Sequence, residues 1–180
     1  MSRRGPPTSF TNLLVLARGD QRAGRSPREP LDLREVIAHL ETRFRVVADR
    51  NQLQFEVSQG DQPLSIVGNP QELDNLFTIL LDNAMKYTPA GGSVRVELAR
   101  DGEECSATVQ DAGIGISEQD LSHIFDRFYR ADKARSMGGG AGLGLSIARF
   151  IADAHGATIT VSSLLGQGSK FCVRFPIGVA

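Results

Sequence analysis

The 180-residue chain contains no tryptophan, two tyrosines, two cysteines and three histidines. Cys105 and Cys172 lie far apart and form no CxxC pair, so neither a zinc pattern nor a disulfide framework is expected, and reduced thiols in the cytoplasm are the simplest interpretation. Three scattered histidines also argue against a His-rich metal site. No apolar run approaches the roughly 18 residues that a membrane span needs. The first ten residues lack the apolar segment of a secretory signal.

A strong charge of either sign is also missing. The formal net charge is −1, whereas nucleic-acid-binding domains usually carry a basic footprint. The first 30 residues are an exception, because they hold six arginines against Asp20 and Glu29. This segment could contact a membrane surface or an acidic partner, although a solvated terminal tail is the simpler interpretation. A chain of this length buries roughly 70% of its unfolded surface, so it can fold as one domain without a disulfide or a bound metal.

Hydrophobic spacing predicts a single α+β domain over residues 30–180, preceded by a short helix at 8–18 and a Gly- and Pro-containing linker at 19–30. Alternation with a period of two predicts strands and hairpins, whereas a 3.6-residue period predicts three long helices. The order favours a two-layer α/β sandwich, with helices on one face of a mixed sheet. The helices are expected at 31–50, 70–87 and 142–155, with a short one within 117–130, and the strands at 53–57, 64–67, 93–98, 105–111, 157–163 and 169–175.

Asp111 is the first candidate site residue. It continues the alternating series of Cys105, Ala107 and Val109, so its carboxylate should lie on the core side of a strand. A buried carboxylate needs a hydrogen-bond donor from the protein or from a ligand. Gly113 and Gly115 follow it and would let a backbone approach a ligand closely. The alternative is an ordinary Asp-Gly turn that ends the strand.

Two further features lie on helices. Residues 138–146, GGGAGLGLS, end where a long helix begins, and free N–H groups at such an end attract anions. The segment matches neither the P-loop nor the dinucleotide pattern, so alone it could be a linker. On the 70–87 helix, Asn83, Lys86 and Tyr87 share one patch. That patch could ligate a metal, neutralise a phosphate and stack on a base, or be a solvated helix face.

Taken together, these segments resemble the sensor histidine kinases. LLDNAMKYTP (80–89) is similar to their N box, QDAGIGI (110–116) to the G1 box and IFDRFYRAD (124–132) to the F box. GGAGLGLSIA (139–148) is similar to the G2 box, and GQGSKF (166–171) to the last glycine motif. The five motifs occur in the family's order and spacing. LVLARGD (14–20) also resembles the end of the dimerisation helix that precedes this catalytic domain.

The resemblance implies the ATP-binding fold that histidine kinases share with gyrase-type and heat-shock chaperone ATPases. It implies that Asp111 accepts the adenine amino group and that Asn83 coordinates Mg²⁺ held through the triphosphate. Lys86 and Arg130 would meet phosphate oxygens, and these two residues with Asn83 would carry the chemistry. Residues 130–141 would form a mobile lid. The other implied nucleotide contacts are Tyr87, Gly113, Gly115, Ile116, Gly140, Gly142, Leu143, Gly144 and Ser169, while His155 would be structural.

The sequence departs from the family at two places. The first Asn of the N box is replaced by Ile79, which we expect beside Asn83 and away from the core stripe of its helix. This removes one oxygen near Mg²⁺. The phosphoacceptor histidine and its acidic neighbour are also missing, because His39, His123 and His155 all fall within the catalytic domain's own elements.

The leading hypothesis is therefore the catalytic domain of a two-component kinase, which transfers the γ-phosphoryl group of Mg·ATP to a histidine on another domain or chain and acts indirectly on a response regulator. The alternatives are a nucleotide-binding interaction module with little kinase activity and an anti-sigma-factor serine kinase. The F box and the LARGD segment argue against the serine kinase. Without the dimerisation hairpin we expect a monomer, in the cytoplasm or on the cytoplasmic side of a larger sensor.

Overall fold

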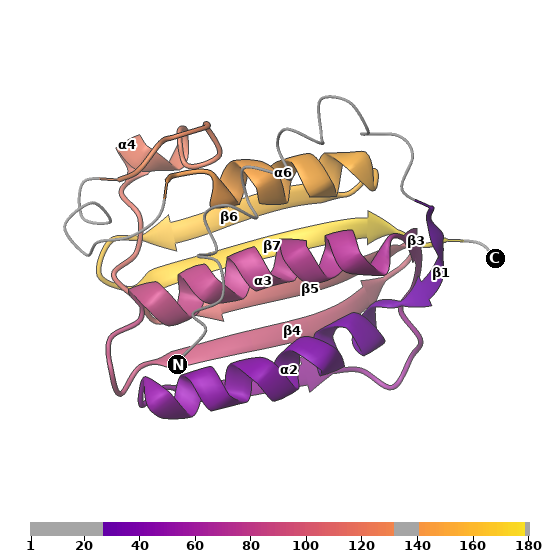
Figure 1. Cartoon of the computed structure of the whole chain (residues 1–180), viewed down its shortest axis with the longest axis horizontal. Helices are drawn as coiled ribbons and strands as arrows, with labels where there is room; N and C mark the ends of the chain where they lie inside the picture. Colours follow the sequence, from indigo (N-terminus) through magenta and orange to yellow (C-terminus); the bar gives the residue numbers. More distant parts are fainter. Residues whose placement is uncertain (1–26, 132–140, 179–180) are drawn as a thin grey trace, which may run out of the picture.

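The computed structural model describes residues 27–131 and 141–178; the expected helix at 8–18, most of the expected linker and residues 132–140 lie outside these ranges. Helices pack over one face of a five-stranded sheet, beside a separate pair of short strands (Figure 1). The elements are, in chain order, β1 (Glu29–Asp32), α2 (Leu33–Arg50), β2 (Gln54–Gln59), β3 (Ser65–Gly68), α3 (Pro70–Tyr87), β4 (Ser93–Asp101), β5 (Glu104–Asp111), α4 (Glu118–Leu121), α6 (Gly144–Ala154), β6 (Thr158–Leu164) and β7 (Gly168–Pro176).

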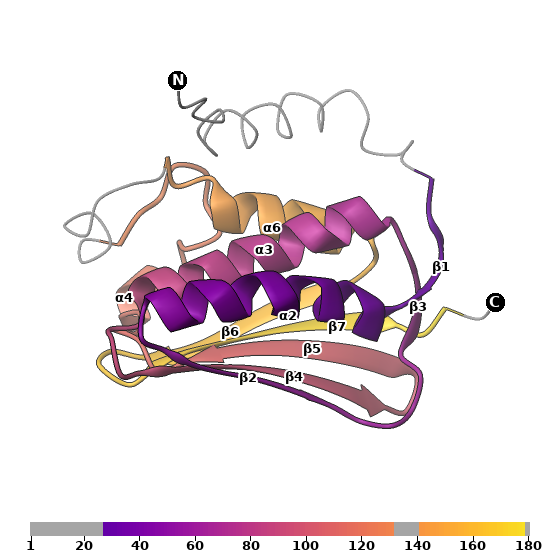
Figure 2. The same cartoon turned by 60° about the horizontal axis from the view of Figure 1, so that its bottom comes forward.

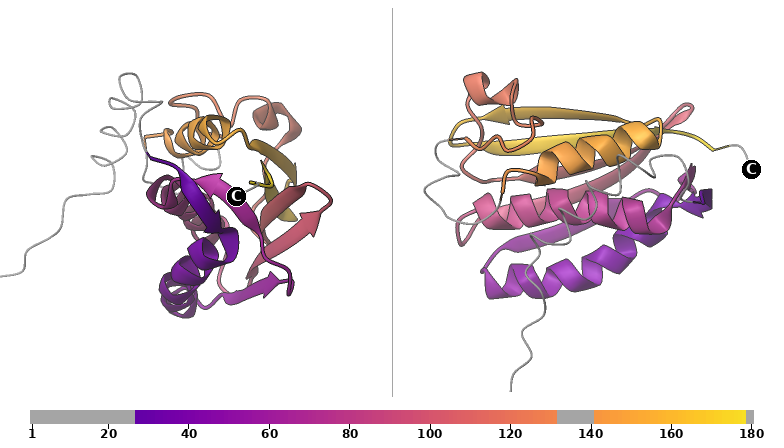
Figure 3. Two further views of the ribbon diagram at one scale, coloured as in Figure 1. Left: turned by 90° about the vertical axis from the view of Figure 1, so that its right-hand side faces the viewer. Right: turned by 45° about the horizontal axis from the view of Figure 1, so that its top comes forward.

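The two layers are visible in Figure 2, where α2, α3 and α6 lie above the sheet. Its strand order is β2-β4-β5-β7-β6. Strand β2 runs parallel to β4, and the other neighbours are antiparallel. Figure 3 shows α3 between α2 and α6. The predicted two-layer α/β sandwich with a mixed sheet is thus confirmed.

Helix α2 begins two residues later than its apolar spacing predicts. Leu31 and Asp32 instead pair with β3, and the Asp32 side chain accepts a hydrogen bond from the backbone N–H of Arg34 at 3.0 Å, as an N-cap does. Pro30, expected to end the linker, lies in the same strand. Its missing N–H is tolerated there because β1 has a single neighbouring strand. The expected boundary between linker and helix was therefore wrong.

Helix α3 spans the predicted residues 70–87 and carries one wall of the site at its C-terminal end. The Asn69 side chain caps its start by accepting from the N–H of Glu72 at 3.0 Å, and Pro70 occupies the first turn. Leu73, Phe77 and the other predicted core residues are buried against the sheet and the neighbouring helices. This burial fixes the rotation of the helix.

Strand β5 positions Asp111 at the edge of the core. Cys105, Ala107 and Val109 are buried on the helix-covered face, and Asp111 follows them with 7% exposure, as the alternation predicts. It is the last residue of β5 and is paired with Val94 on one side and with Ser169 on the other. A central position in the sheet holds the carboxylate at the edge of the core.

Two glycines let the β6–β7 turn close against the chain that follows Asp111. Gly115 has a φ of +67°, and a Cβ there would lie 2.1 Å from the carbonyl oxygen of Leu164. Gly168 has a φ of +101°, and a Cβ would lie 1.9 Å from the carbonyl oxygen of Asp111. Any larger residue at either position would push the two segments apart.

The segment between Asp111 and α6 is less helical than expected. The short helix expected within 117–130 is limited to the four residues of α4, and turns follow it. Phe128 has a φ of +65°, and its N–H donates to the carbonyl of Gly142 at 2.8 Å. Helix α6 starts at Gly144, two residues after the expected boundary, and ends at Ala154. No helix of residues 27–131 and 141–178 is both long and apolar enough to span a bilayer.

Candidate functional site

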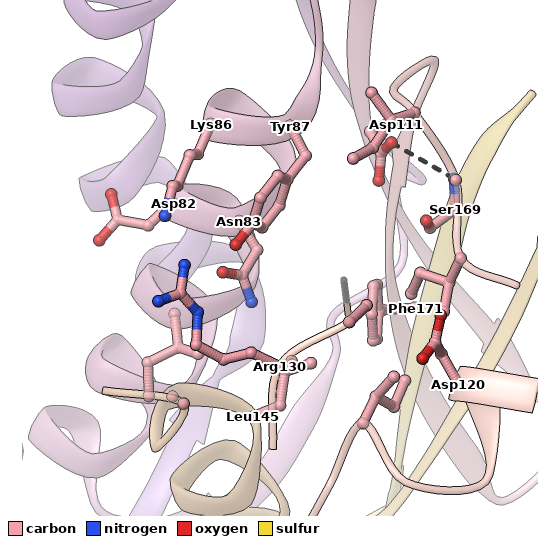
Figure 4. Close-up of a pocket in the computed structure, with 18 of the residues that line it drawn as sticks. Asp82, Asn83, Lys86, Tyr87, Asp111, Asp120, Arg130, Leu145, Ser169 and Phe171 are labelled. Atoms are coloured by element: carbon pink, nitrogen blue, oxygen red, sulfur yellow. Dashed lines mark hydrogen bonds between the residues drawn. The ribbon is translucent and has the colours of Figure 1, made fainter. Parts of the chain in front are cut away.

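A solvent-open pocket of about 790 Å³ lies between the C-terminal part of α3, the end of β5 and the start of α6 (Figure 4). Segments far apart in the sequence meet here. Most of the sequence-predicted site residues line it, namely Asn83, Lys86, Tyr87, Asp111, Gly115, Ile116, Arg130, Gly142, Leu143, Gly144 and Ser169. Gly113 packs behind the wall, where a Cβ would lie 2.5 Å from the carbonyl oxygen of Tyr87. Gly140 lies outside the described residues.

The Asp111 carboxylate is only partly paired by the protein. Its Oδ1 accepts hydrogen bonds from the N–H of Gly113 at 2.9 Å and from the N–H of Ser169 at 3.3 Å. Among residues 27–131 and 141–178, no donor reaches Oδ2. Figure 4 shows the carboxylate at the pocket wall beside Ser169. A carboxylate oxygen that faces a pocket and has no protein donor is available to a ligand that can donate.

Desolvation by the surrounding protein raises the pKa of Asp111, and the two N–H donors oppose the rise. Desolvation therefore makes the ionised form of Asp111 costly. A ligand N–H group at Oδ2 would stabilise it, because a hydrogen bond to a charged acceptor is stronger than one between neutral groups.

The α3 wall carries the polar patch predicted from the sequence. Asn83 and Tyr87 are half-buried, Lys86 is exposed, and the Lys86 ammonium lies 5.0 Å from the centre of the Tyr87 ring. The Tyr87 carbonyl accepts the N–H of Ile114 at 3.1 Å, which ties the end of α3 to the loop after β5. A cation, an amide and an aromatic ring therefore line one wall.

Asp82, on the same wall, was missed by the sequence analysis. Desolvation raises the pKa of its carboxyl, and the positive charge of Arg43 partly opposes the rise. Figure 4 shows the side chain beside Asn83, with Arg130 extending toward them across the pocket. Its position directly before Asn83 in the sequence was a usable signal, but the sequence analysis considered only Asn83, Lys86 and Tyr87 on this helix.

Ile79 differs from its expected placement. It lines the pocket near Asn83, as expected, but it is also only 7% exposed and belongs to the apolar core. A Cβ on Gly144 would lie 3.3 Å from Ile79 Cγ2, so this side chain packs against the start of α6. The buried surface of α3 is therefore wider than the expected core stripe and includes Ile79, because α6 covers this flank of the helix.

The opposite wall holds a hydrogen-bonded cluster that the sequence did not reveal. The Tyr129 hydroxyl donates to Oδ1 of Asp120 at 2.5 Å, and the Ser117 hydroxyl donates to Oδ2 at 2.6 Å. All three residues line the pocket. Ser117 also caps α4 through the N–H of Asp120. The Ser-x-x-Asp spacing was a usable signal for that cap, but the approach of Tyr129 depends on the turns between them.

The start of α6 supplies backbone donors. Leu143 at its N-cap position makes no side-chain capping hydrogen bond, and Gly142, Leu143, Gly144 and Leu145 all line the pocket. Gly142 has a φ of +71°, and a Cβ there would lie 2.7 Å from the carbonyl oxygen of Tyr129. First-turn N–H groups and the helix dipole make this end attractive to anions.

His155 lies at the far end of α6 and has the structural role expected for it. Its Nε2 accepts the N–H of Asn69 at 3.1 Å, and its Nδ1 donates to the carbonyl of Ile151 at 2.8 Å. It therefore ties the end of α6 to the start of α3. Within the described part of the chain, no group of three or more His, Cys, Asp or Glu side chains is arranged to hold a metal ion.

Comparisons with known proteins agree with this geometry. The profile of the histidine kinase-, DNA gyrase B- and HSP90-like ATPase family matches residues 68–179. The sensor histidine kinase RppB of Synechocystis sp. is 38% identical over 171 residues, which cover 93% of this chain and 37% of that protein. The chain therefore spans little more than a third of this relative.

Solved structures of histidine kinases have the same fold. The mycobacterial sensor histidine kinase MprB has a TM-score of 0.70 and 30% identity, over 83% of this chain and 97% of that one. Full-length ShkA in complex with AMPPNP has a TM-score of 0.83 and 25% identity, over 96% of this chain and 36% of that one. The chain belongs to the histidine kinase-, DNA gyrase B- and HSP90-like ATPase family and contains the ATP-binding catalytic domain of the sensor histidine kinases.

Proposed function

We propose that this domain binds Mg·ATP with the adenine at Asp111 and transfers the γ-phosphoryl group to a histidine on another domain or chain. The main support for this proposal is the Asp111 carboxylate. Its Oδ1 accepts hydrogen bonds from two backbone N–H groups, while its Oδ2 has no donor among the described residues. The adenine 6-amino group supplies the missing donor. A 6-oxo purine would bring a second acceptor to the same oxygen and be rejected.

The rest of the adenine site is apolar and surrounds the ring. Ile114, Ile116, Leu165 and Phe171 line the pocket near Asp111 and Ser169, and Tyr87 faces them from α3. Gly115 would allow close backbone approach at the ring edge, with Gly113 supporting the wall from behind. Flat apolar walls with one fixed polar edge suit a purine base.

The phosphates would lie between the end of α3 and the start of α6. Lys86 and Arg130 supply positive charge there, and the N–H groups around Gly142, Leu143 and Gly144 supply hydrogen-bond donors. Phosphoryl transfer depends mainly on positioning and charge neutralisation rather than on covalent steps by the protein. Gly140 and the rest of the proposed lid belong to the same site by resemblance alone.

Mg²⁺ fits the donor set at this end of α3. Asn83 offers an amide oxygen, and Mg²⁺ typically takes few protein ligands and keeps phosphate oxygens and waters as the others. The ion would neutralise charge on the phosphates when bound. Asn83 holds and orients it, and the buried Ile79 beside Asn83 gives it no oxygen.

The acceptor histidine and the wider pathway also follow as proposals. Sensor histidine kinases act on a phosphoacceptor domain and through it on a response regulator, at the cytoplasmic side of the membrane. We expect the same partners here, with residues 1–29 as the end of the dimerisation helix and a linker, and residues 30–180 as the catalytic domain. The packing of Leu33 and the rest of α2 into the core supports a boundary near residue 30.

One observation favours a second candidate, a nucleotide-binding module with little transfer activity. Ile79 fills the place of an oxygen ligand and packs against α6, so Mg·ATP could bind without being well oriented. The serine kinase alternative has no comparable support, because the F box is present.

The test is transfer to an added phosphoacceptor domain. The chain is incubated with that domain and γ-labelled ATP, and we expect acid-labile, base-stable phosphohistidine on the acceptor. An acceptor without its histidine and an Asn83→Ala variant are the controls, and both should stay unlabelled. Tight ATP binding with no label would favour the binding module, and acid-stable label would favour a serine kinase.

A further inference from the structure

Ser163 lies directly behind Ser169, outside the pocket lining. It is on the edge strand β6, paired with Ser169 of β7. Its Oγ makes three contacts: it accepts the N–H of Ile116 at 2.8 Å, donates to the carbonyl of Gly168 at 2.7 Å and lies 2.9 Å from Oγ of Ser169. Two of these partners, Ile116 and Ser169, line the pocket.

Counting protons fixes the direction of the contact between the two serines. A serine hydroxyl carries one proton. The carbonyl oxygen of Gly168 can only accept, so the single proton of Ser163 is used there. The hydrogen bond between the hydroxyls must therefore be donated by Ser169 and accepted by Ser163.

This direction determines what Ser169 offers to the pocket. Its proton points at Ser163, and its N–H is used by Oδ1 of Asp111. Toward the pocket Ser169 therefore presents lone pairs only. The Oδ2 of Asp111, its neighbour across the β5–β7 pair, is an acceptor too. The wall at the end of these strands thus presents two acceptors and no side-chain donor.

We propose that Ser163 is a positioning residue that makes this wall selective for 6-amino over 6-oxo purines by holding the Ser169 hydroxyl as an acceptor. The proposal rests on the proposed function, because it takes the purine edge to lie at Asp111. Asp111 gives the larger part of the preference, and Ser163 adds to it by preventing Ser169 from donating to a C6 carbonyl.

The test compares ATP with inosine triphosphate, which has a carbonyl at C6, by titration calorimetry on the whole chain. In Ser163→Ala the Ser169 hydroxyl is free to rotate and to donate to that carbonyl. We expect the ratio of ATP to inosine triphosphate affinity to fall by about tenfold, on the scale of one hydrogen bond. ATP should remain preferred because Asp111 is unchanged.

Two matched variants control for loosening of the wall. Ser162→Ala alters the exposed neighbour on the same strand and should keep the wild-type ratio. Ser163→Thr keeps the hydroxyl, so it should also keep the wild-type ratio of ATP to inosine triphosphate affinity. Loss of the acceptor for the Ile116 N–H in Ser163→Ala would weaken both nucleotides by a common factor, so a merely structural role would leave the ratio unchanged.

A Ser163→Ala variant with the wild-type ratio would overturn the role of Ser163 and leave the adenine site standing. A wild-type chain that binds the two nucleotides equally, or neither, would overturn the proposed function at Asp111 and the role of Ser163 with it. A ratio that is reduced in Ser163→Ala but retained in Ser163→Thr would support both the adenine site at Asp111 and the role of Ser163.

Discussion

His155 and Asp111 are both buried polar residues, and they lie at opposite ends of helices α3 and α6. Both ring nitrogens of His155 are hydrogen-bonded within the protein. In Asp111 one carboxylate oxygen takes both backbone donors, and within the described residues the other oxygen has none. A polar group that is fully satisfied by its own chain ties elements together, whereas a half-satisfied one at a pocket wall is prepared for a ligand. Similar burial therefore serves stability at one end and binding at the other.

The largest expected effect concerns His155, whose hydrogen bonds join the end of α6 to the start of α3. His155→Ala removes the acceptor of the Asn69 N–H and leaves a cavity beneath the start of α3. We expect the free energy of unfolding to fall by about 3–4 kcal/mol, measured by chemical denaturation. The exposed His39→Ala is the control and should stay within about 0.5 kcal/mol of wild type. A small loss in His155→Ala would mean that its hydrogen bonds do not join the two helices.

The next effect concerns Ile79, which belongs to both the core and the pocket. Ile79→Ala and Ile79→Asn should each lower the free energy of unfolding by about 2–3 kcal/mol, because both lose the packing against α6. Only the Asn variant adds an oxygen beside Asn83, so only it should increase the effect of Mg²⁺ on ATP affinity, by about tenfold. Affinities with and without Mg²⁺ separate the two roles. An Asn variant with the same Mg²⁺ dependence as the Ala variant would show that Ile79 is a packing residue alone.

The smallest effect concerns the stability of the nucleotide-free protein. Asp111→Asn keeps an oxygen for the two N–H donors and removes a poorly solvated charge. We expect the variant to be more stable than wild type near neutral pH by about 1 kcal/mol, the scale of one hydrogen bond, because the carboxylate is largely removed from water. Thermal unfolding without nucleotide measures this. A less stable variant would mean that the charge is well compensated in the empty pocket.

The pH dependence of that difference has a definite sign. The folded-state pKa of Asp111 is raised above its ordinary value of 3.8 by desolvation. The folded protein therefore holds the proton more tightly than the unfolded chain, and wild-type stability should be lost as the pH rises through the raised pKa. Asn cannot titrate, so its advantage should be absent below the ordinary value and grow through this window. If the stability advantage of Asp111→Asn over wild type did not change with pH, the pKa of Asp111 would not be raised in the folded protein.

Periodicity predicted much of the fold because the long helices and hairpins are amphipathic. Helix α3 and the β4–β5 hairpin lie where their spacing places them, and the core side of Asp111 followed from an alternation of two. Strand β1 was missed because it is only four residues long and continues directly into α2, so that the residues before Leu33 fit a first helical turn as well as a strand. Only pairing with β3 and the Asp32 cap decide between them.

The site was predicted less completely because side-chain contacts depend on register and turns. The partners of Ser163 come from β6, β7 and the loop after β5, and no local spacing joins them. Tyr129 reaches Asp120 only through the turns after α4. The burial of Ile79 depends on how close α6 lies to α3, which the α3 sequence does not contain.

The most direct test of the account is the nucleotide preference at Asp111. In Asp111→Asn, the amide oxygen still accepts from Gly113 and Ser169, so the NH₂ group faces the pocket and donates where the carboxylate accepted. We predict that ATP affinity falls by about 1.5–3 kcal/mol and that the preference of the wild type for ATP over inosine triphosphate is lost or reversed, measured by titration calorimetry on both proteins. An Asp111→Asn variant that binds ATP as tightly as wild type, with the same preference over inosine triphosphate, would contradict the assignment of the adenine site.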